Sequence, residues 1–130
     1  MRRRRGSAMV EAALVTTSFI FLLVGIMDFG RLGFAYNSVT YAAHRAARFA
    51  ATNGSGSGHA ASASDIQSNV QSNIVALDTS SLTVNVTWTP DNHPGSKVQV
   101  VVSYSFKPLL IPISSSALTL KSTSSQIITQ

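Results

Sequence analysis

The hydrophobic residues follow a different pattern in each part of the chain, and the first part is almost uniformly apolar. From Ala12 to Met27 there is no charged residue, and Glu11 is the one charge between residues 7 and 27. About 21 helical residues extend roughly 31 Å, close to the hydrocarbon thickness of a bilayer. The pattern therefore predicts a transmembrane or filament-core helix over residues 7–28.

A helical periodicity continues beyond this apolar segment. Apolar residues recur at alternating intervals of three and four positions, which places them on one face of a helix at the spacing of coiled coils. We predict that residues 29–52 form an amphipathic continuation, ending in a left-handed cap at Asn53-Gly54. The stripe comprises Phe29, Leu32, Tyr36, Val39, Ala43, Ala46 and Ala50. It fits packing against the chain's own C-terminal part as well as packing in a filament core, because a second row (Phe34, Tyr41, Phe49) lies on another side.

The next segment begins with a linker. Residues 53–62 are rich in Gly and Ser and predict a flexible connector. Between Asp65 and Asp78 apolar residues then recur at helical spacing, with Ser62 or Ser64 as a candidate N-cap. The members of this apolar face are Ile66, Val70, Ile74 and Leu77. A short helix is therefore expected at the start of the C-terminal part, residues 63–130.

Strict alternation of apolar and polar residues replaces the helical pattern near residue 82. It runs over 82–88, over 98–106 and again from residue 118, and predicts half-buried strands. The expected fold is α+β: a long N-terminal helix packed on a small antiparallel sheet of three to four strands, with one short helix. The apolar face of the sheet needs a cover, which the helix stripe can supply. Leu109-Leu110-Ile111, between two prolines, is either a plug for this core or an exposed contact patch.

The charge distribution changes what the composition suggests. The net charge is +5, but four arginines stand together at positions 2–5. From residue 7 onward there are six basic and five acidic residues, a net charge of +1. Basicity is therefore confined to the N-terminus, and we expect no nucleic-acid partner. Arginines before an apolar span hold that end in the cytoplasm, which predicts an N-terminus inside and the remainder outside.

Three interpretations of the N-terminus compete. A secretory signal peptide also joins a basic segment to an apolar one, although this stretch is long and no A-x-A site closes it. A plain single-span anchor fits the length but leaves Glu11 unexplained, since a carboxylate just inside an apolar span is costly. A cleaved leader over residues 1–6 is the third interpretation, and it accounts for the glutamate.

The same residues resemble a known family. A basic run, Gly6, a glutamate at the fifth position after it and a long apolar helix are similar to a type IV prepilin leader. Residues 5–54 resemble the TadE-like pseudopilins of the tight-adherence (Flp) pilus system, which carry a Gly-Arg pair and an Ala-Ala-Arg-x-x-Ala-Arg run like Gly30-Arg31 and the segment 42–48 here. The resemblance implies a pilin-like fold, and cleavage by a prepilin peptidase between Gly6 and Ser7.

Glu11 acquires a role from this resemblance and from charge burial. Cleavage after Gly6 would create an α-amino group at Ser7, and in a bilayer or filament core an ammonium and a carboxylate are each costly alone and tolerable as a pair. In pilins the glutamate is thought to pair with a neighbour's N-terminus, which makes Glu11 a candidate device for assembly and register. The alternative is a carboxylate that stabilises the start of its own helix.

One position departs from the family. A proline usual about ten residues into the mature helix is replaced by Thr16-Thr17-Ser18. The kink that such a proline makes is then absent, or is softened to hydroxyl bonds back to the helix.

Residues for catalysis or metal binding are sparse. There is no cysteine, and His44, His59 and His93 are too widely spaced for a local metal motif. No serine lies in a G-x-S-x-G turn, and the glycines at 54–58 lack the G-K-[ST] of a phosphate loop. We therefore expect no enzyme, no metal and no cofactor.

The resemblance also implies partners and a location. They are a prepilin peptidase, other copies of this chain or other pilins, the pilus assembly platform with its ATPase, and membrane lipid before assembly. The expected location is the bacterial inner membrane, with the N-terminus cytoplasmic and the C-terminal part extracytoplasmic, and then a surface pilus used in adhesion. The alternative is a single-span membrane protein that presents a small extracytoplasmic binding domain without polymerising.

Overall fold

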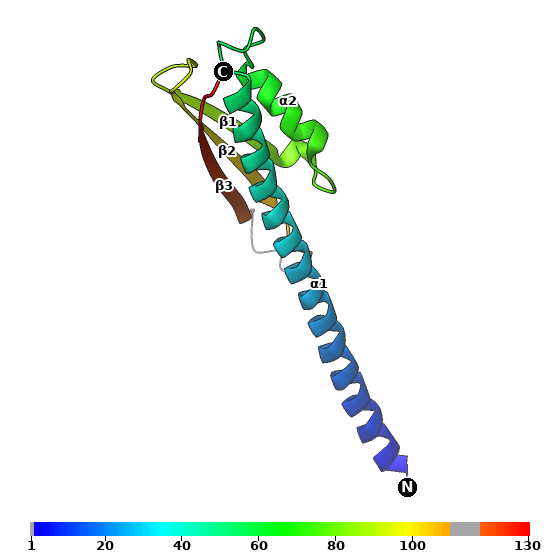
Figure 1. The fold of residues 1–130 in the computed structure, drawn as a ribbon. Coiled ribbons are helices and arrows are strands. Elements are labelled where there is room, and N and C mark those ends of the chain that lie inside the picture. The colour runs from blue at the N-terminus through cyan, green and yellow to red at the C-terminus, as the bar shows by residue number, and fades with distance from the viewer. Residues whose placement is uncertain (1, 110–117) are drawn as a thin grey trace.

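One long helix with a small head near its C-terminal end makes up the molecule (Figure 1). The computed structural model describes residues 2–109 and 118–130, with backbone alone for residues 2–5. Its elements are, in order, α1 (Arg2–Thr52), α2 (Ala63–Asn73), the 3-10 turn η1 (Thr79–Ser81), β1 (Leu82–Thr89), β2 (Lys97–Phe106) and β3 (Leu118–Ile127). We call the part that contains α2, η1 and the three strands the head. The predicted α+β fold is confirmed.

Helix α1 is continuous through the position where the family carries a proline. The Thr17 hydroxyl donates to the Ala13 carbonyl at 2.8 Å, and the Ser18 hydroxyl donates to the Leu14 carbonyl at 2.9 Å. These are the predicted bonds from hydroxyls back to the helix. With no proline, α1 keeps its hydrogen-bond ladder and extends about 76 Å for its 51 residues.

The sheet is a simple antiparallel meander. Its strand order is β1-β2-β3; β2 pairs along its whole length with β3, and from Lys97 to Tyr104 with β1. Every second residue of β2 faces α1, and the valines among them (Val98, Val100, Val102) are fully buried. Each such side chain contributes about 1.5–3 kcal/mol of hydrophobic stabilisation. The sequence allowed for three to four strands, and the described residues form three.

The C-terminal half of α1, where the buried residues run from Ala35 to Ala51, packs against this row of valines mainly through alanines. Ala43, Ala46 and Ala47 have no exposed surface, and Val39 and Ala50 keep only 1%. Contacts reach β2, β3 and α2, so the helix has the sheet on one side and α2 on another. Small side chains permit this, because a helix surrounded on two sides has no room for long ones.

The predicted stripe overlaps only partly with this buried surface. Phe29 and Tyr36 are 77% and 54% exposed, and Leu32 is half-buried. As packing against the head, this part of the prediction is wrong; packing in a filament stays a prediction. The buried surface is instead wider than a stripe and also includes Ala35, Ala42, Ala47 and Ala51. Periodicity gives the direction of a helix face, but it does not show how far a sheet covers it.

The end of α1 also differs from expectation. Neither Asn53 nor Gly54 has a positive φ, so no left-handed cap forms there. The Asn53 side chain and backbone N–H both donate to the Phe49 carbonyl, at 2.9 and 3.1 Å. A Cβ on Gly54 would meet the Gln130 carbonyl oxygen and the Ile128 side chain. The glycine is therefore needed for the close approach of the C-terminal segment.

The Gly/Ser segment 53–62, expected as a flexible connector, is bonded to the head. The Ser55 N–H donates to the Asn92 carbonyl at 2.9 Å, and the Ala61 N–H donates to the Asn53 carbonyl at 2.8 Å. Gly54 and Ala61 are buried. Small residues here allow the backbone to lie close to the turn between β1 and β2.

Helix α2 begins where the sequence indicates. Ser62 is its N-cap and forms a capping box with Asp65, and hydrogen bonds from Ser62 lower the pKa of the Asp65 carboxyl. Ile66 and Val70 are buried beneath it. The helix ends at Asn73, earlier than predicted, because Ile74 is extended and Ala76 has a φ of 61°.

The first prediction concerns the close approach at Gly54. We expect Gly54→Ala to destabilise the full-length protein in detergent by about 1–3 kcal/mol, because the added methyl group displaces the C-terminal segment. Thermal unfolding followed by circular dichroism measures the change. Gly33→Ala is the matched control, since nothing lies within 4 Å of its added Cβ. Equal melting temperatures for the two variants would contradict the packing described.

The second prediction concerns pH. Asp91 accepts a hydrogen bond from the Ser96 hydroxyl at 2.7 Å and one from the His93 N–H at 3.1 Å, and these bonds lower the pKa of its carboxyl. A lowered pKa means that the stabilisation is complete above the ordinary aspartate value of about 3.9 and is lost as the pH falls below it. We expect the melting temperature to fall below that pH, and to fall less steeply in Asp91→Asn. Parallel curves for the two proteins would remove Asp91 from the acid response.

Candidate assembly and membrane surface

The N-terminal half of α1, residues 6–27, presents an apolar surface that no other described part of the chain covers. Gly6–Thr52 is the one helix in the described part of the chain that is long and apolar enough to cross a membrane, and its most apolar window of 18 residues has a mean hydropathy of 2.1. None of that apolar window is buried. Large side chains are exposed on every side of the helix, among them Leu14, Phe19, Phe21, Leu22 and Ile26. A signal sequence near an N-terminus has the same appearance, whereas a buried core helix does not.

The residues predicted for processing and assembly lie together at the start of this surface. Gly6, Ser7 and Glu11 line one open depression of α1 with Val10, Leu14 and Val15. All three are exposed, and Ser7 and Glu11 are one helical turn apart. Within the described residues, Glu11 has no hydrogen-bond or ion-pair partner. A carboxylate on an apolar helix is costly without a partner once water is removed, which makes Glu11 a candidate for pairing with a cation.

The fold does not require a glycine at position 6. An added Cβ there would meet nothing within 4 Å, and glycine in a helix interior costs about 1 kcal/mol relative to alanine. The same holds for Gly25, Gly30 and Gly33, where the space for a Cβ is also open. Packing within the described residues therefore gives no reason for the glycine at position 6.

A polar junction marks the end of the apolar segment. Arg31 forms an ion pair with Asp28 at 3.0 Å, as the spacing of three residues predicts. The other Asp28 oxygen accepts a hydrogen bond from the Leu109 backbone N–H at 2.8 Å, and the Arg31 guanidinium lies over the Phe106 ring at 5.5 Å from its centre. These two contacts join α1 to the end of β2. Sequence reasoning missed them, because about 80 residues separate the partners and no local spacing connects them.

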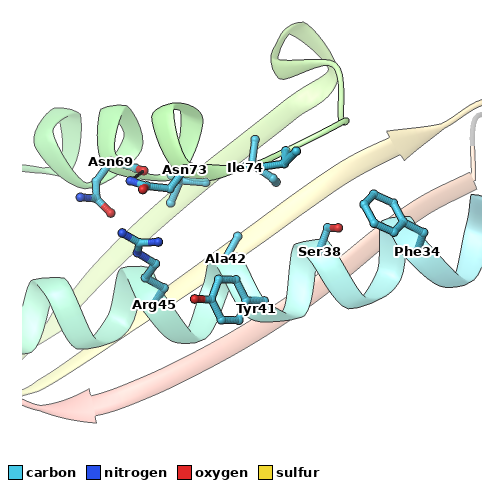
Figure 2. Close-up of a pocket in the computed structure, with 10 residues that line it drawn as sticks. Phe34, Ser38, Tyr41, Ala42, Arg45, Asn69, Asn73 and Ile74 are labelled. Carbon is cyan, nitrogen blue, oxygen red and sulfur yellow. Dashed lines mark hydrogen bonds between the residues drawn. The ribbon is translucent and has the colours of Figure 1, made fainter.

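A small groove separates α1 from α2 (Figure 2). Ala42, Val70 and Ile74 line it, with Phe34 and Tyr41 on the α1 side, and its volume is about 150 Å³. Arg45 reaches from α1 toward Asn69 and Asn73 of α2. The volume is below the 300–1,000 Å³ of typical small-molecule sites. Two members of the predicted second row thus border this groove, while the third, Phe49, packs against the core.

The histidines lie far apart and are bonded separately. His44 Nδ1 is 3.0 Å from the Ser124 hydroxyl, and His93 Nδ1 is 2.8 Å from the Ser55 hydroxyl. Among the residues that the structure describes, no three His, Cys, Asp or Glu side chains are grouped so as to hold a metal ion.

Comparison with known proteins agrees with the position of these features. A family model described as "TadE-like protein" matches residues 6–48. Neither the curated proteins nor the solved structures gave a match. The matched segment begins at Gly6, contains Glu11 and the whole apolar surface of α1, and ends at Arg48 among the buried alanines. An N-terminal apolar helix of this kind fits membrane association, and the resemblance to TadE-like, pilus-related proteins of the tight-adherence system is confirmed over residues 6–48.

Proposed function

We propose that this chain is a structural subunit, a pilin or minor pseudopilin, of a TadE-like pilus. A prepilin peptidase removes residues 1–6, and the subunit then assembles through its hydrophobic N-terminal helix. The role is structural and needs no catalysis, metal or cofactor. Its partners are the peptidase, other pilin subunits, and the assembly platform with its ATPase.

One observation carries this proposal: the most apolar part of α1 is uncovered while the rest of α1 is closely packed. A monomer in water would not keep so many large apolar side chains exposed, because each one costs about 1.5–3 kcal/mol relative to burial. Lipid covers this surface before assembly, and neighbouring helices cover it afterwards. Both environments are apolar, so the same side chains suit both.

Glu11 supplies the specificity that apolar contacts lack. Hydrophobic packing between helices is tolerant of sliding, whereas a buried carboxylate can pair only with a cation at the correct height. The new α-amino group at Ser7 is such a cation. In the proposed assembly, Glu11 of one subunit binds the Ser7 amine of the next and sets the register between them.

The N-terminal arginines orient the subunit before processing. In the proposed topology they keep residues 1–6 in the cytoplasm, residues 7–28 cross the inner membrane, and the head lies outside. After cleavage the net charge falls to +1, so that subunits stack without strong mutual repulsion. The assembled form is a pilus on the cell surface, with adhesion as its expected role.

The second candidate is a single-span membrane protein that presents its head to a ligand and does not polymerise. The junction of α1 with the head supports it equally, since a firm joint would also hold a binding domain above a membrane. This candidate gives no reason for Gly6 or for an unpartnered Glu11.

The third prediction tests processing. We expect the mature chain to begin at Ser7, as measured by intact mass of protein isolated from membranes of cells that contain the peptidase. Gly6→Ala should fold normally, because the space around position 6 is open, and should remain uncut. Gly25→Ala, an equally open position of the same helix, is the control and should be cut. A wild-type chain that still begins at Met1 would exclude the processing step.

The fourth prediction tests the register role of Glu11. We expect Glu11→Val and Glu11→Gln to be cleaved and inserted normally but to be lost from sheared pilus fractions, because the Ser7 amine then has no anion to bind. Ser18→Val is the control, since it also replaces a polar group on the same helix and should still assemble. Normal amounts of either Glu11 variant in pili would remove this residue from the assembly mechanism.

A further inference from the structure

The lower end of the head lies at the level where the apolar segment of α1 stops. Asp28 is the first charged residue after Glu11, and the apolar residues between them have the length of a bilayer crossing. The hydrogen bond from the Leu109 N–H to Asp28 fixes the end of the β2 segment at that height. If residues 7–28 cross a membrane, Leu109 lies at its surface.

Large apolar side chains are exposed at this level, which is unusual for the end of a domain that lies in water. Leu109 is 65% exposed, and Phe29 on α1 is 77% exposed. Lys107 is also exposed. We call Phe29 of α1, together with Lys107 and Leu109 of the segment that follows β2, the foot. Leu109 is therefore exposed and is not buried as a plug for the core; Leu110 and Ile111, the other members of that predicted segment, lie outside the described residues.

We infer that the foot is a second membrane contact, in which Leu109 inserts into the lipid leaflet nearest the head and Asp28 holds it there. Leucine and phenylalanine at the boundary are favoured below the lipid headgroups, while the long Lys107 side chain can extend to the phosphates. The Asp28 carboxylate binds both the Leu109 N–H and Arg31, so the Leu109 N–H is paired at the edge of the lipid. This inference rests on the membrane span of the proposed function.

Lipid is a better occupant for Leu109 than the rest of the chain. The groove between α1 and α2 is bordered by Phe34 and higher residues of α1, above the level of Asp28. Continuity with the apolar segment places lipid, and not the head, next to the exposed Leu109 side chain. The consequence is a head that rests on the membrane at a set angle and must release the foot when the subunit enters a filament.

The test uses the fact that the chain has no cysteine. Single cysteines replace Leu109, Ile127 and Ile20 in the full-length protein, which is spin-labelled in vesicles of phosphatidylethanolamine and phosphatidylglycerol. Ile127 is the matched control, because its side chain is also 65% exposed. It is paired with Lys97, at the end of the sheet opposite to Phe106 and the foot. Accessibility to oxygen, which concentrates in lipid, is compared with accessibility to a water-soluble nickel complex.

We expect the oxygen-to-nickel ratio to be several-fold higher at Leu109→Cys than at Ile127→Cys, and to approach that of Ile20→Cys. Adding Asp28→Ala should shift the Leu109 ratio toward the Ile127 value; an unchanged ratio would overturn the role of Asp28. A Leu109 label that is accessible to nickel, or protected from both reagents, would overturn the membrane contact while Ile20 still reports lipid. An aqueous ratio at Ile20 would instead reject the membrane span itself.

Discussion

The close contact between the alanines of α1 and the valines of β2 is the interaction on which the rest of the structure depends. Ala43, Ala46 and Ala47 are completely buried against a strand whose inward-facing valines are also completely buried. This contact lets the strands and α2 lie on two sides of one helix, so a small head forms a core without a second large helix. It also fixes the head to the upper half of α1 and leaves the lower half free.

Because of this contact, the two halves of α1 have different surroundings, although α1 remains one continuous helix. A helix satisfies its own backbone hydrogen bonds in water, in lipid and in a protein core. Only the side chains must change, and they do: large apolar residues where the described chain leaves the helix uncovered, and alanines where the sheet approaches. The hydroxyls of Thr17 and Ser18 bond to their own helix, so these polar groups need no partner elsewhere.

Local patterns allowed much of this fold to be predicted. The three strands, the Ser62 cap and the Asp28–Arg31 pair follow from alternation, capping chemistry and helical spacing, each of which involves neighbours in sequence. Several of the failures depend on distant neighbours. The sequence predicts Gly54 as part of a left-handed cap, because its true reason, the passage of the C-terminal segment, lies more than 70 residues away.

The candidate site shows the same division. A short motif predicts the roles of Gly6, Ser7 and Glu11, and these roles stay predictions; the family model matches the segment that contains them, residues 6–48. Nothing local indicated that Phe29 and Tyr36 would remain exposed, or that the N–H of Leu109 would bind Asp28. Where a sheet stops covering a helix is decided by strand lengths and loop paths, and these are not encoded in the helix.

Helix α1 carries two acidic residues, Glu11 and Asp28. They differ in whether the carboxylate has a partner within the described part of the chain. Asp28 is only 12% exposed at its side chain, and it binds both Arg31 and the Leu109 backbone. Glu11 lies on a part of α1 that no other described element covers, and its carboxylate has no partner in the described residues. A carboxylate in an apolar environment either becomes protonated or finds a cation. Asp28 completes a junction within the subunit, whereas Glu11 has no such partner in the described residues, and the proposed pairing with a neighbour's new N-terminus would supply one.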